Sequence, residues 1–467
     1  MNNIKYTFIF GIIIFFSNIY SFSSGVGIDA LHGVGVSATI ILTSFLFLDY
    51  KINKRFSYAG LFSIILFLFH FGQLILFTYF EDIYPHIRFL LLLSPVNALY
   101  GFRIMLLAFS ALCLGCFVKY LFIKSKRAFI SNETECHYNW IEIAKRIIYL
   151  TFFVKLALDA ITLYISFTGG GSAAREFVNN FPNVFLFYGK ISLLGFALLL
   201  VALRDKPVVQ TRFFVFIIAY ILVMMMSGIR SENVGYLAVF LFIYLQSRNK
   251  SLKFSQILQY AVLGFFCLTF IVAVGRFRSY TNKSLDSFLE LTEKLILEEN
   301  VLLGLFDTCG DTGYTAQEAI NEYLPRFSPS YGDAYYKGVF AVLPNLFPSF
   351  IDFGTLTEEG ASAVKLQKSN VLEKNYFNIG GSFFAEIFMN FGIVGGVMFS
   401  FIWGLFFGWL SRTSVIAFDN RNLHRLLYMI PLMLATIYWV RSSFGGGIRE
   451  AVWDILFGYL VIRYYKK

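Results

Sequence analysis

Long apolar stretches recur along the whole chain and are separated by short polar connections. A stretch of about 20 apolar residues is long enough for an α-helix to cross the hydrocarbon core of a bilayer, and the chain holds about twelve of them. The predicted spans are residues 6–22, 30–49, 57–80, 101–123, 147–168, 184–203, 213–228, 234–247, 257–275, 392–411, 426–440 and 451–464. We therefore expect an all-α polytopic membrane protein.

Composition excludes the soluble alternatives. Hydrophobic residues make up 57% of the chain and charged residues only 15%, whereas soluble domains carry about 25% charged residues. The formal net charge of +10 would suit a nucleic-acid binder if the basic residues clustered on one soluble face. They are instead spread over the connections between spans, so we expect no nucleic-acid partner.

Lysines and arginines concentrate in every second connection. These connections hold Lys51, Lys54, Arg55, Lys124, Lys126, Arg127, Lys145, Arg146, Arg204, Lys206, Arg212, Arg248, Lys250, Lys253, Arg412, Arg421 and Arg425. The positive-inside rule places such connections in the cytoplasm, and with them both termini. The excess positive charge is thus an orientation signal.

The opposite side of the membrane receives short connections and one long polar segment. We divide the chain accordingly into residues 1–275 with spans one to nine, residues 276–380 as an outer loop, and residues 381–467 with spans ten to twelve. In the loop, residues 286–303 and 315–324 have helical periodicity. A segment this long and polar is more than a connector, so we expect it to carry function.

The short outer stretches and the start of the loop contain arginine and no lysine. Their arginines are Arg175, Arg230, Arg276, Arg278, Arg441 and Arg449, accompanied by Glu232 after Arg230 and by glycines. Arginine's planar fork suits bidentate capture of phosphate, and glycine lets the backbone approach a ligand. We therefore predict a shared anionic ligand, most simply a lipid phosphate or pyrophosphate.

Two other interpretations of these charges remain open. Each arginine can extend to the outer interface or pair with a neighbouring glutamate.

The aromatic residues of the loop suit the faces of sugar rings, but they suit packing onto the membrane interface equally well. Lys155 and Asp159, four residues apart inside a span, are typical of a buried structural pair.

A second cluster of polar residues stands where the tenth span begins. Glu386 and Asn390 are four residues apart and share one helical face, shortly after Ser382. A carboxylate at membrane depth is costly and usually functional. Glu386 would orient or deprotonate an acceptor hydroxyl, or else hold one of the arginines in an ion pair.

These residues carry a resemblance. The many spans, the large late outer loop, the Gly-Ser-x-x-Ala-Glu-x-x-x-Asn-Phe-Gly-x-x-Gly stretch at residues 381–395 and the outer arginines resemble the O-antigen polysaccharide polymerase (Wzy) family of bacterial inner membranes. The resemblance implies a glycosyltransferase that works on the periplasmic face without a metal or other cofactor. It would transfer the growing glycan from undecaprenyl pyrophosphate to the non-reducing end of a new lipid-linked unit.

The resemblance also implies roles and partners. Arg441 and Arg230 would hold the donor pyrophosphate, and Glu386 would serve the acceptor hydroxyl. The expected substrate-binding residues are Arg175, Arg276, Arg278, Arg449, Glu232, Ser382 and Asn390. The expected partners are lipid-linked repeat units and membrane lipids, together with a chain-length regulator and a flippase.

Three alternative functions remain. An O-antigen ligase has a similar layout. A resemblance to that family would imply a histidine in the large periplasmic loop, and no histidine occurs here between His137 and His424. A transporter of lipid-linked oligosaccharide or solute would use the arginines along a path, but internal repeats are not visible. A scaffolding membrane protein would leave the arginine pattern unexplained.

Overall fold

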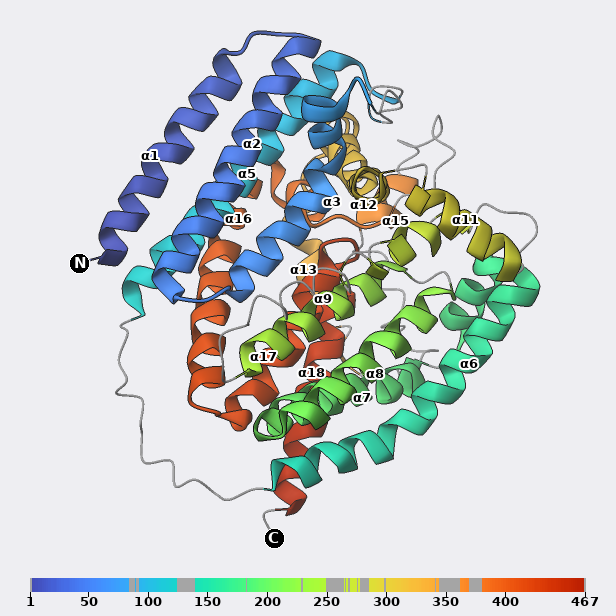
Figure 1. Cartoon of the computed structure of the whole chain (residues 1–467). Helices are drawn as coiled ribbons and strands as arrows, with labels where there is room; N and C mark the ends of the chain where they lie inside the picture. Colours follow the sequence, from blue (N-terminus) through green and yellow to red (C-terminus); the bar gives the residue numbers. More distant parts are fainter. Residues whose placement is uncertain are drawn as a thin grey trace. The chain divides into compact units, whose positions relative to one another are not determined.

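The computed structural model describes most of the chain and shows helices as its regular elements there (Figure 1). The described residues are 2–83, 89, 92–123, 139–181, 183–227, 230–248, 264, 266–267, 269–274, 276–277, 285–297, 300–340, 342–343, 362–368 and 380–465. The all-α class predicted from the apolar pattern is confirmed.

The helices are as follows, in chain order. They are α1 (Asn2–Ser23), α2 (Ile28–Asn53), α3 (Tyr58–Phe80), α5 (Pro95–Phe122), α6 (Trp140–Asn180), α7 (Asn183–Ala202), η1 (Leu203–Asp205), α8 (Pro207–Met225), α9 (Arg230–Ser247), α11 (Leu285–Leu297), α12 (Val301–Glu318), η2 (Ala319–Tyr323), α13 (Asp333–Phe340), α15 (Ser362–Lys368), α16 (Phe383–Asp419), α17 (Leu423–Trp439) and α18 (Phe444–Tyr465).

Eight of the described helices are long and apolar enough to cross a membrane. They are Asn3–Ser23, Ile28–Asn53, Tyr58–Phe80, Pro95–Phe122, Trp140–Gly170, Phe185–Asp205, Pro207–Met225 and Phe383–Asp419. The predicted spans at 234–247, 426–440 and 451–464 are helical but are not among these eight, and much of 257–275 lies outside the described residues. The number of twelve spans stays a prediction.

Local sequence explains where several helices begin and bend. The Ser57 hydroxyl accepts the Gly60 N–H at the start of α3, and Ser94 caps α5, which has proline at its first turn. Glycine with positive φ interrupts two long helices, at Gly170 in α6 (φ 85°) and at Gly392 in α16 (φ 67°). A side chain is strained in that conformation, so glycine permits these bends.

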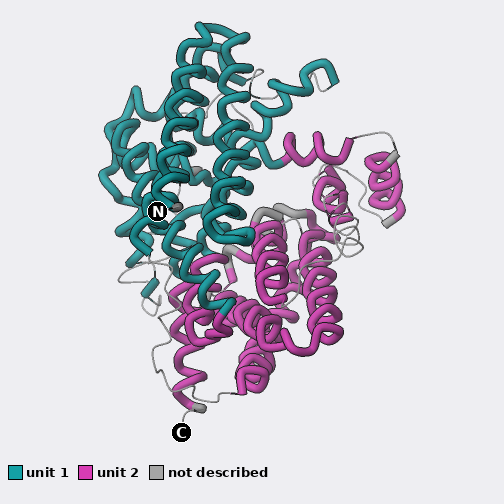
Figure 2. Tube along the Cα trace, turned by 60° about the vertical axis from the view of Figure 1, so that its left-hand side comes forward, with its two compact units in different colours: residues 1–133, 309–419, 435–449 teal, residues 134–308, 420–434, 450–467 magenta. Residues whose placement is uncertain are grey.

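The chain forms two compact units, coloured separately in Figure 2. Unit 1 comprises residues 1–133, 309–419 and 435–449. Unit 2 comprises residues 134–308, 420–434 and 450–467. Each unit is therefore assembled from segments far apart in the sequence.

In unit 1, α5 and α16 pack at very short range. A Cβ atom at Gly404 would overlap the carbonyl of Leu112, and one at Gly408 would lie 2.7 Å from the carbonyl of Cys116. Small residues at such crossings allow helices in a membrane to approach closely and gain dispersion contacts. Phe407 of α16 also stacks on Phe62 of α3, with ring centroids 3.9 Å apart.

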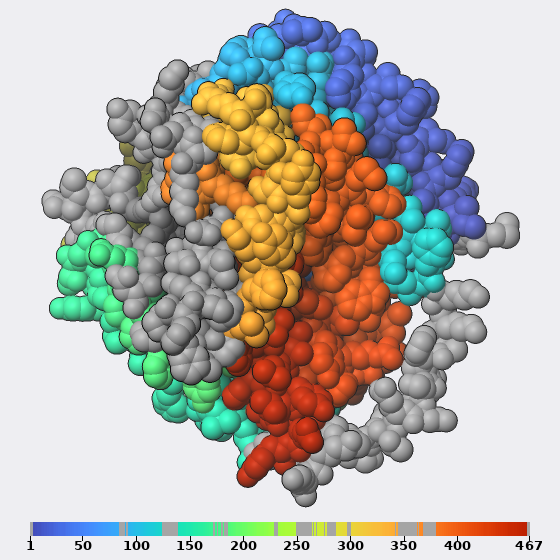
Figure 3. All heavy atoms as spheres, turned by 180° about the vertical axis from the view of Figure 1, so that it is seen from behind, coloured from blue at the N-terminus to red at the C-terminus, as the bar shows by residue number. Residues whose placement is uncertain are grey.

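The outer loop, residues 276–380, contributes α11, α12, η2, α13 and α15. The sequence predicted one helix ending near residue 303 and a second beginning near 315, but α12 runs without a break from Val301 to Glu318 and continues as the π-helix η2. Gly310 explains the difference, because its missing side chain lets α12 pack on α3, where a Cβ would lie 2.5 Å from the Gln73 nitrogen. Figure 3 shows the surface of η2 and α13 in gold beside the orange surface of α16, which both contact.

In unit 2, α6, α7, α8 and α9 form the core. The Lys155 ammonium lies 3.0 Å from the Asp159 carboxylate, with side chains only 15% and 19% exposed. The Tyr220 hydroxyl of α8 also donates to Asp159. The predicted pair is present at these positions, half-buried rather than fully buried, and it joins α6 to α8.

Alanine at Gly404 should lower the melting temperature of the purified protein. The added Cβ would overlap the Leu112 carbonyl and force α5 and α16 apart, although alanine favours a helix over glycine by about 1 kcal/mol. The measurement is thermal unfolding of full-length protein in mild detergent.

Gly11→Ala in α1 is the matched control, because no heavy atom lies within 4 Å of a Cβ built there. Its melting temperature should be equal to or above that of the parent. Equal melting temperatures for both variants would contradict the proposed role of the close α5–α16 contact.

Candidate functional site

Glu386 and Asn390 lie on the short first part of α16, before the bend at Gly392. Both are buried, with exposed fractions of 1% and 0%. The Asn390 side-chain amide donates to the backbone carbonyl of Glu386 at 2.7 Å. The two residues therefore lie on one face of a single helical segment, as their spacing predicts.

The Glu386 carboxylate accepts a hydrogen bond from the backbone N–H of Phe444. The distances from that nitrogen to Oε1 and Oε2 are 3.2 and 3.3 Å. Phe444 is the first residue of α18, so the carboxylate lies at the positive end of the helix dipole. Among the described residues, no arginine forms an ion pair with Glu386. Glu386 thus holds the segment that follows Arg441.

Aromatic side chains surround this carboxylate. The Trp439 ring lies 4.7 Å from Trp403, 5.3 Å from Phe444 and 6.0 Å from Tyr335, measured between centroids. Within the described part of the chain, the buried indole nitrogen of Trp403 and the hydroxyl of Tyr335 have no hydrogen-bond partner, whereas the Trp439 side chain interacts with the Glu386 carboxylate. Buried donors are usually satisfied, so this cluster retains unused hydrogen-bonding capacity.

Ser382 forms the start of α16. Its hydroxyl accepts the Ala385 N–H at 3.2 Å and lies 2.8 Å from Nε2 of His70. The other ring nitrogen of His70 lies 3.0 Å from the Leu66 carbonyl, which can only accept. Assigned from this network, Nδ1 carries the proton and Nε2 accepts from Ser382. His70, which the sequence interpretation did not include, therefore ties α3 to α16.

Arg441 lies two residues beyond the end of α17 and packs against the segment that leads into α16. Its guanidinium carbon lies 5.8 Å from the centre of the Phe69 ring, and a Cβ at Gly380 would lie 3.4 Å from its Nε. A Cβ at Gly381 would overlap the carbonyl of Ser442. Among the described residues no carboxylate pairs with Arg441. The two glycines are thus needed for the approach of the Arg441 segment.

Asn390 also binds the outer loop. Its side-chain oxygen accepts the backbone N–H of Ala334 at 3.1 Å, in the first turn of α13. Close by, the Ser330 N–H donates to the carbonyl of Met389 at 2.9 Å. Asn390 therefore positions α13 on the segment that carries Glu386.

Two lysines of the outer loop join this part of unit 1. Lys365 and Lys337 each lie 3.1 Å from the carboxylate of Asp333. Burial acts to raise the pKa of Asp333, but hydrogen bonds from Tyr336 and both lysines outweigh it, so the pKa lies below its usual value. The sequence interpretation missed these lysines because it considered arginines in the short outer stretches. The occurrence of these lysines within an aromatic-rich loop was the sequence feature that could have indicated them.

Unit 2 contains a separate charged cluster centred on Lys190 of α7. The Lys190 ammonium lies 2.5 Å from Glu232 of α9 and 2.5 Å from Glu450 of α18. The Tyr236 hydroxyl donates to Glu232. Glu232 follows Arg230 by two residues and Glu450 follows Arg449 directly, so Lys190 holds together two helices that carry predicted site arginines.

The remaining predicted residues are placed as follows. Arg276 is helical and its guanidinium lies 3.8 Å from a Cβ built at Gly304, and Arg449 is buried. Arg175 and Arg230 belong to α6 and α9, but their side chains lie outside the described residues, as does Arg278. The contacts thus join Ser382, Glu386, Asn390 and the Arg441 segment within unit 1, and Glu232 with Lys190 within unit 2.

Comparison with known proteins gives one match. The family model described as O-antigen polysaccharide polymerase Wzy matches residues 4–467. A search of the curated proteins and a search of the solved structures found no match.

Methionine at Lys190 should destabilise the protein by roughly 3 kcal/mol, because removing one partner of a buried ion pair leaves the opposite charge uncompensated. Two carboxylates would lose their shared cation here. The measurement is thermal unfolding in detergent, compared with the parent protein.

The triple variant Lys190→Met, Glu232→Gln, Glu450→Gln is the control, since it removes every charge of the triad. It should recover a large part of the lost stability. If Lys190→Met unfolds at the parental temperature, the triad does not hold α7, α9 and α18 together.

Proposed function

The chain belongs to the O-antigen polysaccharide polymerase Wzy family, and we propose that it extends the glycan on the periplasmic face of the inner membrane. A family member is an O-antigen repeat-unit polymerase and a multi-pass membrane protein that acts on lipid-linked oligosaccharide units. In our proposal the donor is the growing glycan on undecaprenyl pyrophosphate. The acceptor is the non-reducing end of a new lipid-linked unit.

The observation that carries the proposal is the surroundings of Arg441. Its guanidinium lies over the Phe69 ring and beside Gly380, and it has no acidic partner among the described residues. When the glycosidic bond breaks, the pyrophosphate leaving group gains negative charge. A guanidinium held in advance at that position stabilises the charge without reorganisation, and its fork matches the phosphate oxygens.

The transfer itself requires one proton movement. The acceptor hydroxyl oxygen attacks the anomeric carbon of the donor, the bond from that carbon to the pyrophosphate oxygen breaks, and its electron pair leaves with the pyrophosphate. The hydroxyl proton passes to a base, for which we propose the carboxylate of Glu386. Glu386 also has a positioning role, since it binds the first N–H of α18 after the Arg441 segment.

The aromatic cluster supports a sugar as the partner of Glu386. Sugar rings combine apolar C–H faces with hydroxyls, and tryptophan and tyrosine offer a ring with a polar tip. Trp439 and Tyr335 interact with the carboxylate, and Trp403 packs on Trp439. The Trp403 indole nitrogen and the Tyr335 hydroxyl have no partner among the described residues. We propose that the acceptor sugar approaches the glutamate from this cluster.

The other predicted residues take supporting roles in the proposal. Arg230 joins Arg441 in binding the donor pyrophosphate. Arg175, Arg276, Arg278 and Arg449 bind donor or acceptor phosphates. Ser382, Asn390 and Glu232 position the helices that carry these groups, a role their hydrogen bonds and ion pair support. A flippase that delivers the units and a chain-length regulator would act with the enzyme, and both termini would lie in the cytoplasm.

Arg441→Lys should abolish polymer while leaving the protein folded. Lysine keeps the positive charge but loses the planar fork that binds two phosphate oxygens. The variant is expressed in the native host lacking its own copy, and the lipopolysaccharide is separated on a gel. A single repeat on the core, without the ladder of longer chains, is the expected result.

Arg463→Lys, an exposed arginine in the last turn of α18, is the matched control and should restore the full ladder. Full-length glycan from Arg441→Lys would refute the role of Arg441. The host carrying no copy tests the function itself. A single repeat indicates a polymerase, a bare core with accumulated lipid-linked polymer a ligase, and loss of outward-facing lipid-linked units a flippase.

Glu386→Gln separates the two roles of Glu386. The glutamine oxygen can still accept the Phe444 N–H, so the fold and the Arg441 segment should be retained. An amide cannot take a proton from the acceptor, so the rate of polymerisation should fall about 100-fold or more. Initial rates with purified enzyme and lipid-linked units measure this. Parental activity in the glutamine variant would leave Glu386 with the positioning role alone.

A further inference from the structure

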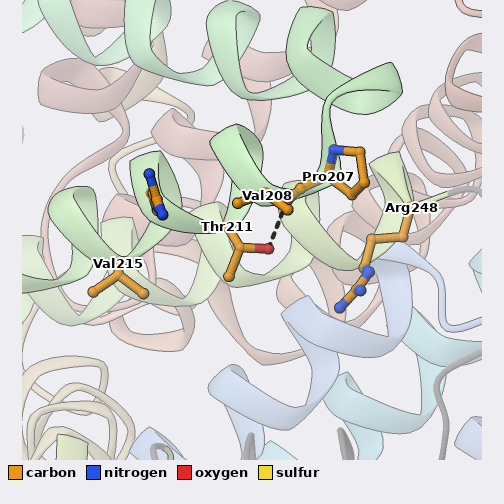
Figure 4. A pocket seen from close by; sticks show the side chains of 6 residues that line it. Pro207, Val208, Thr211, Val215 and Arg248 are labelled. Atoms are coloured by element: carbon orange, nitrogen blue, oxygen red, sulfur yellow. Dashed lines mark hydrogen bonds between the residues drawn. The ribbon is translucent and has the colours of Figure 1, made fainter.

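A recess lies at the beginning of α8, in unit 2. It is a shallow, open recess with a volume of about 530 Å³, lined by Pro207, Val208, Thr211, Arg212, Val215 and Arg248. Figure 4 shows Pro207, Val208 and Thr211 of α8 beside Arg248, which follows α9. The positive-inside pattern places this end of α8 on the cytoplasmic side.

The recess combines positive charge with apolar walls. Arg212 and Arg248 contribute guanidinium groups, and none of the six lining residues is acidic. Val208 and Val215 are 63% and 51% exposed, and exposed valines on a membrane helix face lipid acyl chains. This arrangement fits a molecule with an anionic head and a hydrocarbon tail.

One of the guanidinium groups is held in place. Arg248 donates to the Tyr244 hydroxyl at 3.3 Å and lies 5.4 Å from the centre of that ring. The Tyr244 ring itself stacks on Phe214 at 4.1 Å, and its hydroxyl lies 2.9 Å from that of Thr211. Arg248 is therefore fixed against α8 before a ligand arrives, which reduces the entropy lost on binding.

The start of α8 adds to the positive potential. Pro207 is the first residue of the helix, and Lys206 before it provides no side-chain cap. The backbone N–H groups of a first helical turn have no partner within the helix, and with the helix dipole they attract phosphate. The nearby Asp205 does not neutralise this end, because Arg421 binds it through two hydrogen bonds of 2.8 and 2.9 Å.

We propose that this recess binds an anionic phospholipid, with the headgroup phosphate between Arg212 and Arg248 and an acyl chain along Val208 and Val215. Basic pockets between helices on the cytoplasmic side are suited to anionic headgroups. The lipid would connect the beginning of α8 to the end of α9 and would remain bound as a structural lipid. The proposal does not depend on the reaction proposed above.

Native mass spectrometry of the delipidated full-length protein tests the proposal. The protein in detergent is titrated with phosphatidylglycerol and, separately, with phosphatidylethanolamine carrying the same acyl chains. The parent protein should bind one phosphatidylglycerol more tightly than any phosphatidylethanolamine. Arg212→Gln with Arg248→Gln should weaken that first binding step roughly tenfold or more, because each arginine near a headgroup contributes separately.

Two further variants make the result specific. Val208→Trp fills the recess without changing its charge and should also weaken the first binding step. Arg463→Gln removes an exposed arginine from the last turn of α18 and should bind like the parent. Equal affinity for the two lipids in the parent overturns the proposal. So does parental phosphatidylglycerol affinity in both the double variant and Val208→Trp, each checked for a monodisperse, folded state.

Discussion

The structure depends on one constraint, that an ionisable side chain within apolar surroundings needs a hydrogen-bond or ion-pair partner close by. Glu386 meets it with the backbone N–H of Phe444, and Lys190 meets it with Glu232 and Glu450. Leaving the Lys190 charge without its partners would cost several kcal/mol. Because each partner comes from a distant part of the sequence, satisfying these charges also fixes which helices lie together. The side chains that serve the proposed chemistry thus also hold helices of the fold together.

Most of the fold could be predicted because the membrane imposes a strong pattern. Apolar runs of span length give the helices, and composition gives the class. The outer loop was harder, since the helix period indicates that a segment is helical but not where it packs. The continuous path of α12 depends on Gly310 lying against α3, a contact between residues more than two hundred positions apart. Pairing at that range leaves no local signal.

In the candidate site, too, local features could be predicted from the sequence, whereas long-range contacts could not. The spacing of Glu386 and Asn390 predicted their shared face. The close approach of the Arg441 segment to Gly380 and Gly381 was not predicted and is seen only in the structure. His70, Lys190 and Lys365 were not predicted. Each resembles an ordinary residue of a span or loop until its partner is known, because a single chain gives no information on long-range pairs. Hydrophobicity locates helices, whereas electrostatic pairing is a property of the tertiary structure.

The bend at Gly392 divides α16 into two parts that make different contacts. The long part beyond the bend must fit the bilayer and the groove of α5, where glycines set the distance. The short part before it carries Glu386 and Asn390 and contacts the outer loop. Substitutions in the short part can therefore reshape the surroundings of the carboxylate while the membrane anchor stays the same. This separation would allow the short part of α16, and with it the accepted sugar, to change during evolution while the long part keeps its packing in the membrane.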